Sequence, residues 1–316
     1  MFKIINIFAI IYCFIDLTIS INHGKINQNY QSIDYTLYFC GGRNDTSVKS
    51  ECNKYDTKTN VWLPIQSMSK ERRHFELIEY NGNLVSIGGE DYSEDLDIVE
   101  SYDPKTNTWT PNNPLNIKRN GLGVAVANET IYSCGGYSKK SDQTLNVCEV
   151  YSVITNDWRL SAPMIEQRSY FALVAHEGYL YAIGGQNEHG PLDSVESYDT
   201  RANKWQPVAN MNEKRIQFSG VSFMGKIIVC GNYPHSNTCE SYDPLTNKWT
   251  LIASMINYRC CFHLIAYNDK LLTVGSDKTG THLIESYDFI TNEWHNSISW
   301  PYDVWDFGAT LFGKFD

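Results

Sequence analysis

The stretch VESYDPKTNTW, residues 99–109, decides the fold, because close copies of it occur five more times along the 316-residue chain. Each copy ends in a tryptophan, and successive tryptophans are 44 to 49 residues apart. A period of this length is typical of repeat architectures, in which each repeat forms one small structural unit. The copies are CNKYDTKTNVW (52–62), CEVYSVITNDW (148–158), VESYDTRANKW (195–205), CESYDPLTNKW (239–249) and IESYDFITNEW (284–294).

The middle of each copy has the composition of a turn. In Asp-Pro-x-Thr-Asn, Pro fixes φ, Asp bonds to its own backbone, and Asn tolerates the left-handed region. The Tyr and the Trp of one copy are therefore predicted to lie on adjacent antiparallel strands, close enough to pack together.

Two further landmarks precede each copy. A β-rich run ends in Gly-Gly or a variant of it, where glycine permits a positive φ and close backbone approach. Asn232 stands in the second glycine position of the fifth repeat and is expected to adopt the same conformation. Further upstream, an Arg is followed three residues later by an apolar residue, at Arg72/Phe75, Arg119/Leu122, Arg168/Phe171, Arg215/Phe218 and Arg259/Phe262.

The order and spacing of these Gly-Gly, Tyr-Asp and Trp landmarks resemble those of the kelch repeat family over nearly the whole chain after its first 35 residues. The resemblance implies an all-β fold, a six-bladed kelch-type β-propeller over residues 36–316. The first repeat lacks its Arg-containing opening strand, whereas the segment DFGATLFGKFD, residues 306–316, has the pattern of an opening strand, with Val304 in place of the Arg. We therefore predict that residues 305–314 complete the first blade.

Three of the six repeats carry cysteine at two fixed positions, immediately before the first Gly and three residues before the Tyr. In the propeller implied by the resemblance, these positions face each other on the second and third strands, about 4.5–5.5 Å apart, which suits a disulfide. The alternative is that buried Cys replaces the Ile or Val of the other repeats. We predict the disulfides Cys40–Cys52, Cys134–Cys148 and Cys230–Cys239, each worth about 3 kcal/mol. The adjacent Cys260 and Cys261 are expected to be two thiols, at least one of them packed.

The N-terminal sequence MFKIINIFAIIYCFIDLTIS has the pattern of a secretory signal peptide. We predict a signal peptide over residues 1–20, a leader over 21–35, and a mature N-terminus near Ile21. Because disulfides persist in oxidising compartments, the cysteine pairs independently favour a secreted, extracellular protein. Two sequons, at Asn44 and Asn128, are compatible with glycosylation.

The composition excludes some classes of function. A net charge of −10 disfavours a nucleic-acid binder and gives no reason to expect a membrane partner. The eight histidines show no metal-ligand spacing, and most are expected at the surface. The sequence contains neither a nucleophile elbow nor a phosphate loop. We therefore expect no enzyme activity, no cofactor and no metal.

The function that remains is binding to another protein. We expect the propeller to bind it as a monomer. The loops that join the second and third strands are expected to share one rim, at residues 43–50, 90–97, 137–146, 186–193, 232–237 and 276–282. Aromatic and charged residues on this rim are candidate contacts: Arg43, Tyr92, Tyr137, His189 and Tyr233. The resemblance places a second set, two residues after the repeat Arg, near the mouth of the axial channel: His74, Tyr170 and Gln217 among them.

Two cytosolic alternatives stay open. The resemblance also fits a kelch-like substrate receptor of a cullin-type ubiquitin ligase, truncated and without its BTB domain, or an actin-binding kelch protein. Only about 35 residues precede the propeller, too few for a BTB domain. The leader and the cysteine pairs favour the secreted interaction module, because a ligase receptor needs neither.

Overall fold

The computed structural model describes residues 35–56, 59–234, 236–267, 269–275 and 283–313. The predicted signal peptide and nearly all of the leader lie outside this range, as does the rim loop 276–282. Within the described residues, the chain forms 28 strands and no helix, and residues 34–316 make one compact unit. None of the described residues builds the long apolar helix that crossing a bilayer requires.

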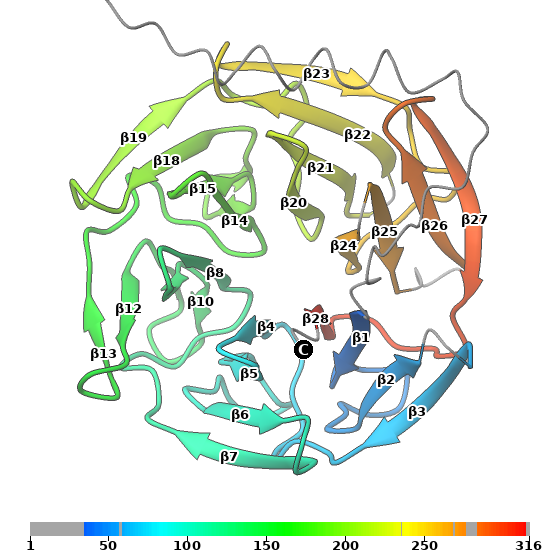
Figure 1. Ribbon diagram of the computed structural model, residues 1–316. Coiled ribbons are helices and arrows are strands. Elements are labelled where there is room, and N and C mark those ends of the chain that lie inside the picture. Colours follow the sequence, from blue (N-terminus) through cyan, green and yellow to red (C-terminus); the bar gives the residue numbers. More distant parts are fainter. Residues whose placement is uncertain (1–34, 57–58, 235, 268, 276–282, 314–316) are drawn as a thin grey trace, which may run out of the picture. The chain divides into compact units, whose positions relative to one another are not determined.

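Six four-stranded antiparallel sheets form the blades of a propeller, as the sequence predicted (Figure 1). From the inner to the outer strand, the first three blades are β28 (Gly308–Gly313), β1 (Tyr35–Cys40), β2 (Cys52–Asp56), β3 (Val61–Ile65); β4 (Glu76–Tyr80), β5 (Asn83–Ile87), β6 (Val99–Asp103), β7 (Thr108–Asn112); and β8 (Gly123–Ala127), β9 (Thr130–Cys134), β12 (Cys148–Ser152), β13 (Asp157–Leu160).

The other three blades are β14 (Ala172–His176), β15 (Tyr179–Ile183), β18 (Val195–Asp199), β19 (Lys204–Val208); β20 (Ser219–Phe223), β21 (Lys226–Asn232), β22 (Ser236–Asp243), β23 (Lys248–Ile252); and β24 (His263–Tyr267), β25 (Lys270–Val274), β26 (Leu283–Asp288), β27 (Glu293–Ser299). Two rim loops contain short hairpins, β10 (Tyr137–Ser138) with β11 (Gln143–Thr144), and β16 (Gln186–Asn187) with β17 (Gly190–Pro191).

The innermost strands of neighbouring blades touch in sequence around the central axis, and β28 lies between β24 and β4 (Figure 1). The prediction that the C-terminal segment completes the first blade is confirmed, since β28 pairs with β1 from Cys40–Gly308 to Tyr35–Gly313. This junction closes the ring and leaves no inner strand edge exposed in the first blade.

The repeated Tyr, Asn and Trp form one structural unit in each blade. In the fourth blade, Tyr198 lies opposite Trp205 and their rings are 4.9 Å apart. The Tyr198 hydroxyl donates to Asn203 Oδ1 at 2.7 Å, and Asn203 has a φ of 52° in the turn. Trp205 Nε1 donates to the Ala162 carbonyl, which joins the outer strand to the chain entering from the preceding blade. The Tyr-Asn-Trp motif therefore stabilises both the turn within its blade and the junction with the preceding blade.

A buried ion pair recurs in five blades. Each repeat Arg is wholly buried and donates to a Glu on the third strand, at 2.6–3.0 Å. The repeated Arg was apparent in the sequence, whereas its Glu partner was not recognised there. The pairs are Arg72–Glu100, Arg119–Glu149, Arg168–Glu196, Arg215–Glu240 and Arg259–Glu285.

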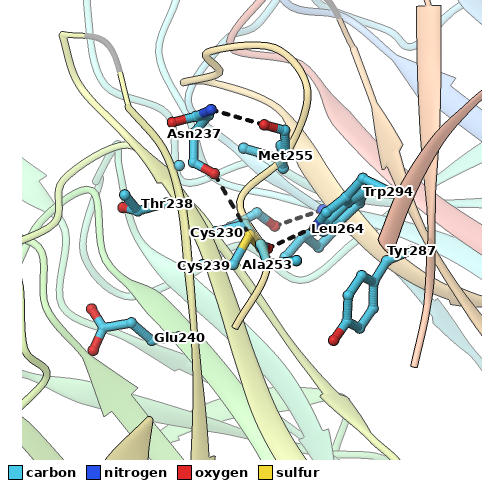
Figure 2. The surroundings of a disulfide bond; sticks show 12 residues. Cys230, Asn237, Thr238, Cys239, Glu240, Ala253, Met255, Leu264, Tyr287 and Trp294 are labelled. Atoms are coloured by element: carbon cyan, nitrogen blue, oxygen red, sulfur yellow. Dashed lines mark hydrogen bonds between the residues drawn. A yellow bond between two sulfur atoms is a disulfide. The ribbon is translucent and has the colours of Figure 1, made fainter. Parts of the chain in front are cut away.

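The three predicted disulfides are present, with Cα–Cα distances of 4.1–4.2 Å. Each joins directly opposed residues of the second and third strands. Figure 2 shows one of them, Cys230–Cys239, beside Met255, Leu264 and Trp294 in an apolar cluster. The alternative of unpaired core cysteines at these six positions is therefore wrong. The sulfur atoms of Cys260 and Cys261 lie 3.4 Å apart, as two thiols, and Cys260 is buried.

Two smaller expectations are wrong. Asn232 is not in the left-handed region, because β21 continues through it and its side chain accepts a hydrogen bond from the Ile216 amide. Surface histidines are fewer than expected among the described residues. His176 is buried against the Ser222 hydroxyl, while His74 and His263 lie at the central channel.

Candidate functional site

One residue from each blade surrounds the mouth of the central channel, two positions after the repeat Arg or its Val304 equivalent. All six have a φ between 49° and 60°. At five junctions, the amide of one donates to the carbonyl of the residue in the preceding blade, at 2.8–3.1 Å. The backbone of the mouth is thus a fixed ring. Its members are His74, Gly121, Tyr170, Gln217, Cys261 and Asp306.

His74 is held between two carboxylates. Its Nδ1 lies 3.0 Å from Glu90 Oε1, and its Nε2 lies 3.1 Å from Asp306 Oδ2. Burial opposes the charged imidazolium, but the carboxylates of Asp306 and Glu90 outweigh it and raise the pKa of His74. The two carboxylates therefore favour the protonated form of His74 within the mouth.

Arginine and lysine side chains compensate the same two carboxylates. Asp306 accepts from Arg43 Nε at 2.8 Å, and Glu90 pairs with Arg73 at 3.2 Å and with Lys139. Burial alone would raise the pKa of Glu90, but its hydrogen bonds to His74 and Lys139 lower it to about 2. The pKa of Asp306 is also depressed, since His74 and Arg43 outweigh its burial.

Four of the predicted contact residues meet at a cavity of about 250 Å³ above this ring. Arg43 comes from the β1–β2 loop, Tyr170 and Gln217 from the ring, and Tyr233 from the β21–β22 turn. Tyr233 is 44% exposed and the Arg43 side chain is 30% exposed, so both are accessible. The Tyr170 hydroxyl donates to Asn120 Oδ1 at 2.9 Å, which fixes the ring. The cavity thus combines the Arg43 cation and the Asp306 carboxylate, which pair with each other, with two tyrosines and two neutral amides.

The remaining predicted rim residues lie in different places. Tyr92 is 57% exposed, with the Arg73 guanidinium 5.9 Å from its ring, so it continues the charged cluster. Tyr137 pairs with Asn120 through its backbone and donates its hydroxyl to Asp142. His189 is at the solvent-exposed tip of the β16–β17 hairpin, where its ring is 3.5 Å from Glu188. The structure therefore brings Tyr92 close to the mouth and gives His189 no contact with it.

The ring also lines a cavity of about 90 Å³, together with the apolar residue that follows each ring position in the chain. Glu76 and His263 add further polar groups to its wall. Burial raises the pKa of Glu76 to about 8, which favours its protonated carboxyl form in this cavity. Burial lowers the pKa of His263, whose Nε2 donates to the Phe307 carbonyl at 2.7 Å.

In the described part of the chain, no three His, Cys, Asp or Glu side chains are placed to bind a metal ion. The only thiol in the ring is Cys261, whose pKa is raised by its hydrogen bond to Cys260, by burial and by the nearby Asp306. A protonated thiol is a weak nucleophile.

The sequence analysis missed His74 as the centre of an ion cluster and missed its partners Glu90 and Asp306. Their proximity depends on the ring closing between the second and first blades, because the His74 amide donates to the Asp306 carbonyl. The distance in sequence between these residues gives no signal for this. The only available hint was that His74 and Asp306 occupy the same repeat position.

The fold and the repeat landmarks define the class of kelch-repeat propellers. The kelch motif matches residues 71–116, 118–165, 167–212 and 215–256, together more than half of the chain. The chain therefore belongs to the kelch repeat family. It is similar to Kelch-like protein 26 of Danio rerio, 30% identical over 212 residues, which are 64% of this chain and 34% of that protein.

Other curated relatives match in the same way. Kelch-like protein 41a of Danio rerio is 27% identical over 220 residues, 66% of this chain and 37% of the relative. Kelch-like protein 40 of Xenopus tropicalis is 26% identical over 200 residues, 62% of this chain and 32% of the relative. The chain thus spans about a third of the length of these relatives.

Among solved structures, the chain is similar to that titled "Structure of YjhT", with a TM-score of 0.71 and 16% identity, covering 82% of this chain and 96% of that one. At this identity the likeness shows the fold alone. It agrees with the propeller described above.

Proposed function

We propose that this protein is a non-enzymatic, extracellular protein-binding module that holds its partner at the channel mouth. The observation that carries the proposal is the convergence of Arg43, Tyr170, Gln217 and Tyr233 on one cavity of about 250 Å³. Arg and Tyr are enriched at the energetically dominant positions of protein interfaces. The rigid ring beneath them supports this, because a preorganised surface loses less entropy on binding.

The charge of the mouth supports a partner segment that carries hydrogen-bond acceptors. Glu90 and Asp306 are already compensated by His74, Arg73 and Lys139 or Arg43. The partly exposed Arg43 guanidinium retains N–H groups that can donate to a partner carbonyl or carboxylate. The partner thus inserts a polar loop or chain end above Asp306.

The binding site is tested by comparing three immobilised propellers in extracellular fluid: the wild type, Arg43→Ala/Tyr233→Ala, and the control Arg201→Ala/Tyr179→Ala. The control removes an exposed Arg and a Tyr that is 40% exposed at the opposite ends of the strands. We expect the wild type and the control to retain a protein that the mouth variant loses. Retention of the same proteins by all three would contradict the proposal.

The extracellular location is supported by the three disulfides, since such bonds persist in oxidising compartments. The competing proposal is a cytosolic Kelch-like protein of the ligase-receptor or actin-binding type, to which the similarity to Kelch-like proteins gives a place. These two possibilities predict different cysteine states in the protein as isolated, disulfides in the first and free thiols in the second.

A further inference from the structure

One blade interface is packed less completely than the others because of a small residue in the middle of the second strand. In five blades, this position holds a large side chain that packs toward the repeat Tyr of the next blade. In the second blade it is Val85. The large residues at this position are Tyr38, Tyr132, Tyr181, Ile228 and Leu272.

The tyrosines at this position in other blades show which space the smaller Val85 side chain leaves unfilled. Tyr132 lies 5.8 Å from Tyr198 of the following blade, and Tyr181 lies 5.8 Å from Tyr242. The corresponding neighbour of Val85 is Tyr151 in the third blade, in the same apolar cluster. Five repeat tyrosines are 1–4% exposed, whereas Tyr151 is only partly buried.

A second difference from the other blades places polar groups beside the space that Val85 leaves. Asn112, at the end of β7, lies opposite Val99. In the other blades with the same pairing, this position is Ile65, Val208 or Ile252. The Asn112 amide donates to the Ser101 hydroxyl at 2.5 Å. An amide and a hydroxyl therefore replace an aliphatic surface.

The two exchanges open a cavity of about 210 Å³ between the second and third blades. Aromatic side chains line it on both sides, with Tyr80 from one blade and Tyr151 and Trp158 from the other. Its polar lining consists of neutral groups, the amides of Asn81, Asn83 and Asn112 and the Ser101 hydroxyl. No charged side chain belongs to the lining. Amides and hydroxyls both donate and accept hydrogen bonds.

We propose that this cavity binds one neutral sugar ring. A ring with hydroxyl groups around its edge matches amides that donate and accept, and its C–H faces match aromatic side chains. An ionic ligand would lose its hydration without a compensating charge, and a purely apolar ligand would leave the amides unpaired. The volume lies below the range of about 300–1,000 Å³ typical of drug-sized ligands, so it suits a single ring.

This site is separate from the channel mouth and does not depend on the proposed function. Asn81 and Asn83 flank the β4–β5 turn, whereas β5 ends at Ile87, next to the glycines of the rim. The cavity thus runs from these strand ends along the blade to Val99 and Asn112, and it shares no lining residue with the mouth cavity. A partner at the mouth and a sugar in the cavity can be bound together.

Ligand-observed NMR with the purified propeller tests the proposal. The probes are free glucose, galactose, mannose and N-acetylglucosamine, with glucuronic acid as a charged comparison. We expect saturation transfer to at least one neutral sugar, with millimolar affinity, and at least tenfold weaker binding of glucuronic acid. The absence of transfer to all four neutral sugars would overturn the proposal.

Two variants locate the binding. Val85→Tyr restores the residue that the third and fourth blades carry, and Asn112→Val restores that of the fourth. Each is expected to weaken sugar binding at least tenfold, while Arg201→Ala/Tyr179→Ala leaves it unchanged. Sugar binding retained by either folded variant would place the ligand elsewhere. If Val85→Tyr does not fold, sugar binding by Asn112→Val alone tests where the ligand lies.

Discussion

The Arg168 guanidinium donates to Glu196 at 2.9 Å, and both side chains are almost completely buried. The other Glu196 oxygen accepts from the Ile165 amide at 2.6 Å, so one carboxylate joins the inner part of the blade to the chain that enters it. Arg168 also donates to the Gly184 and Ser194 carbonyls, at the two ends of the rim loop. This pair therefore fixes the loop as well as the blade.

The first blade shows that the fold tolerates a replacement of both partners. Val304 stands where the other blades have Arg, and Asn53 stands where they have Glu. Asn53 accepts a hydrogen bond from the Tyr302 hydroxyl at 3.1 Å. An unpaired buried charge is thus avoided by changing both positions together.

Breaking one pair should be much worse than replacing it. We expect Glu196→Asn to lower the free energy of unfolding by about 3–5 kcal/mol, because it leaves the buried Arg168 charge without its partner. Arg168→Val/Glu196→Asn, which copies the first blade, should cost less than the single change. Urea denaturation of both variants and of Arg168→Val completes the cycle. If the stability losses of the two single variants add up to the loss of the double variant, the two residues do not act as a pair.

The cysteine state tests the extracellular proposal. After expression of the full chain in secreting cells, we expect denatured, unreduced protein to react with alkylating reagent only at Cys260 and Cys261, and reduction to expose six more thiols. The variant Cys134→Ile/Cys148→Val, which copies the even blades, should expose four. Mass spectrometry counts the labels and reads the mature N-terminus, expected near Ile21. Labelling of all eight of these cysteines without reduction, with Cys13 as a ninth where the N-terminal segment is retained, would favour the cytosolic alternative.

His74 and His263 should titrate in opposite directions from the ordinary value of 6.5. Burial disfavours charge on both, but only His74 faces carboxylates, Glu90 and Asp306. NMR titration of the ring C–H signals should give a pKa above 6.5 for His74 and below it for His263. The assignments come from His74→Asn and His263→Gln. A His74 pKa below 6.5 would contradict the ion cluster.

The raised pKa of His74 also makes the stability of the fold depend on pH. Because the folded-state pKa of His74 is raised, its charged form stabilises the fold fully below the unfolded-state pKa, and this contribution is lost as the pH rises through the folded-state value. His74→Asn keeps a residue that tolerates the left-handed region. Its loss of stability relative to the wild type should therefore be largest in mildly acidic buffer and shrink in alkaline buffer.

Glu76 predicts a pH trend in the same direction for a carboxyl group, because its folded-state pKa is also raised. Its pKa rises from 4.5 to about 8 through burial, so the wild-type fold loses relative stability as the pH increases across that window. Glu76→Gln cannot ionise. We expect its urea midpoint to match the wild type in acid and to exceed it progressively toward pH 8. Parallel pH profiles for the two proteins would show that Glu76 ionises normally.

Much of the fold was readable from the sequence because the repeats obey local rules. Tyr198, Asn203 and Trp205 lie within one hairpin, so their spacing alone predicts the turn and the packing. The disulfides followed from comparing repeats at two positions. The paired Glu of each blade was also readable, since Asn53 replaces it only where Val304 replaces Arg, and the sequence analysis overlooked this correlation.

The candidate sites were predictable only in part. Arg43, Tyr92 and Tyr233 were expected on one rim, but sequence does not show how far each loop reaches toward the axis. His74 acquires its charge from Glu90 and Asp306, which depends on ring closure. The cavity beside Val85 arises from a side chain that is too small for its interface, and such a void is visible only once the neighbouring blade is in place.

The pairing of β28 with β1 has a consequence during biosynthesis. The ribosome makes β1 early, but the strand that completes its blade emerges only after the five other blades have been made. Until then, one edge of the β1–β2 hairpin lacks its neighbour. Both cysteines of the Cys40–Cys52 disulfide lie in that hairpin, so the bond can hold β1 and β2 in register until β28 has been made. Oxidation of the nascent chain would thus prepare a template on which the final strand completes the circle.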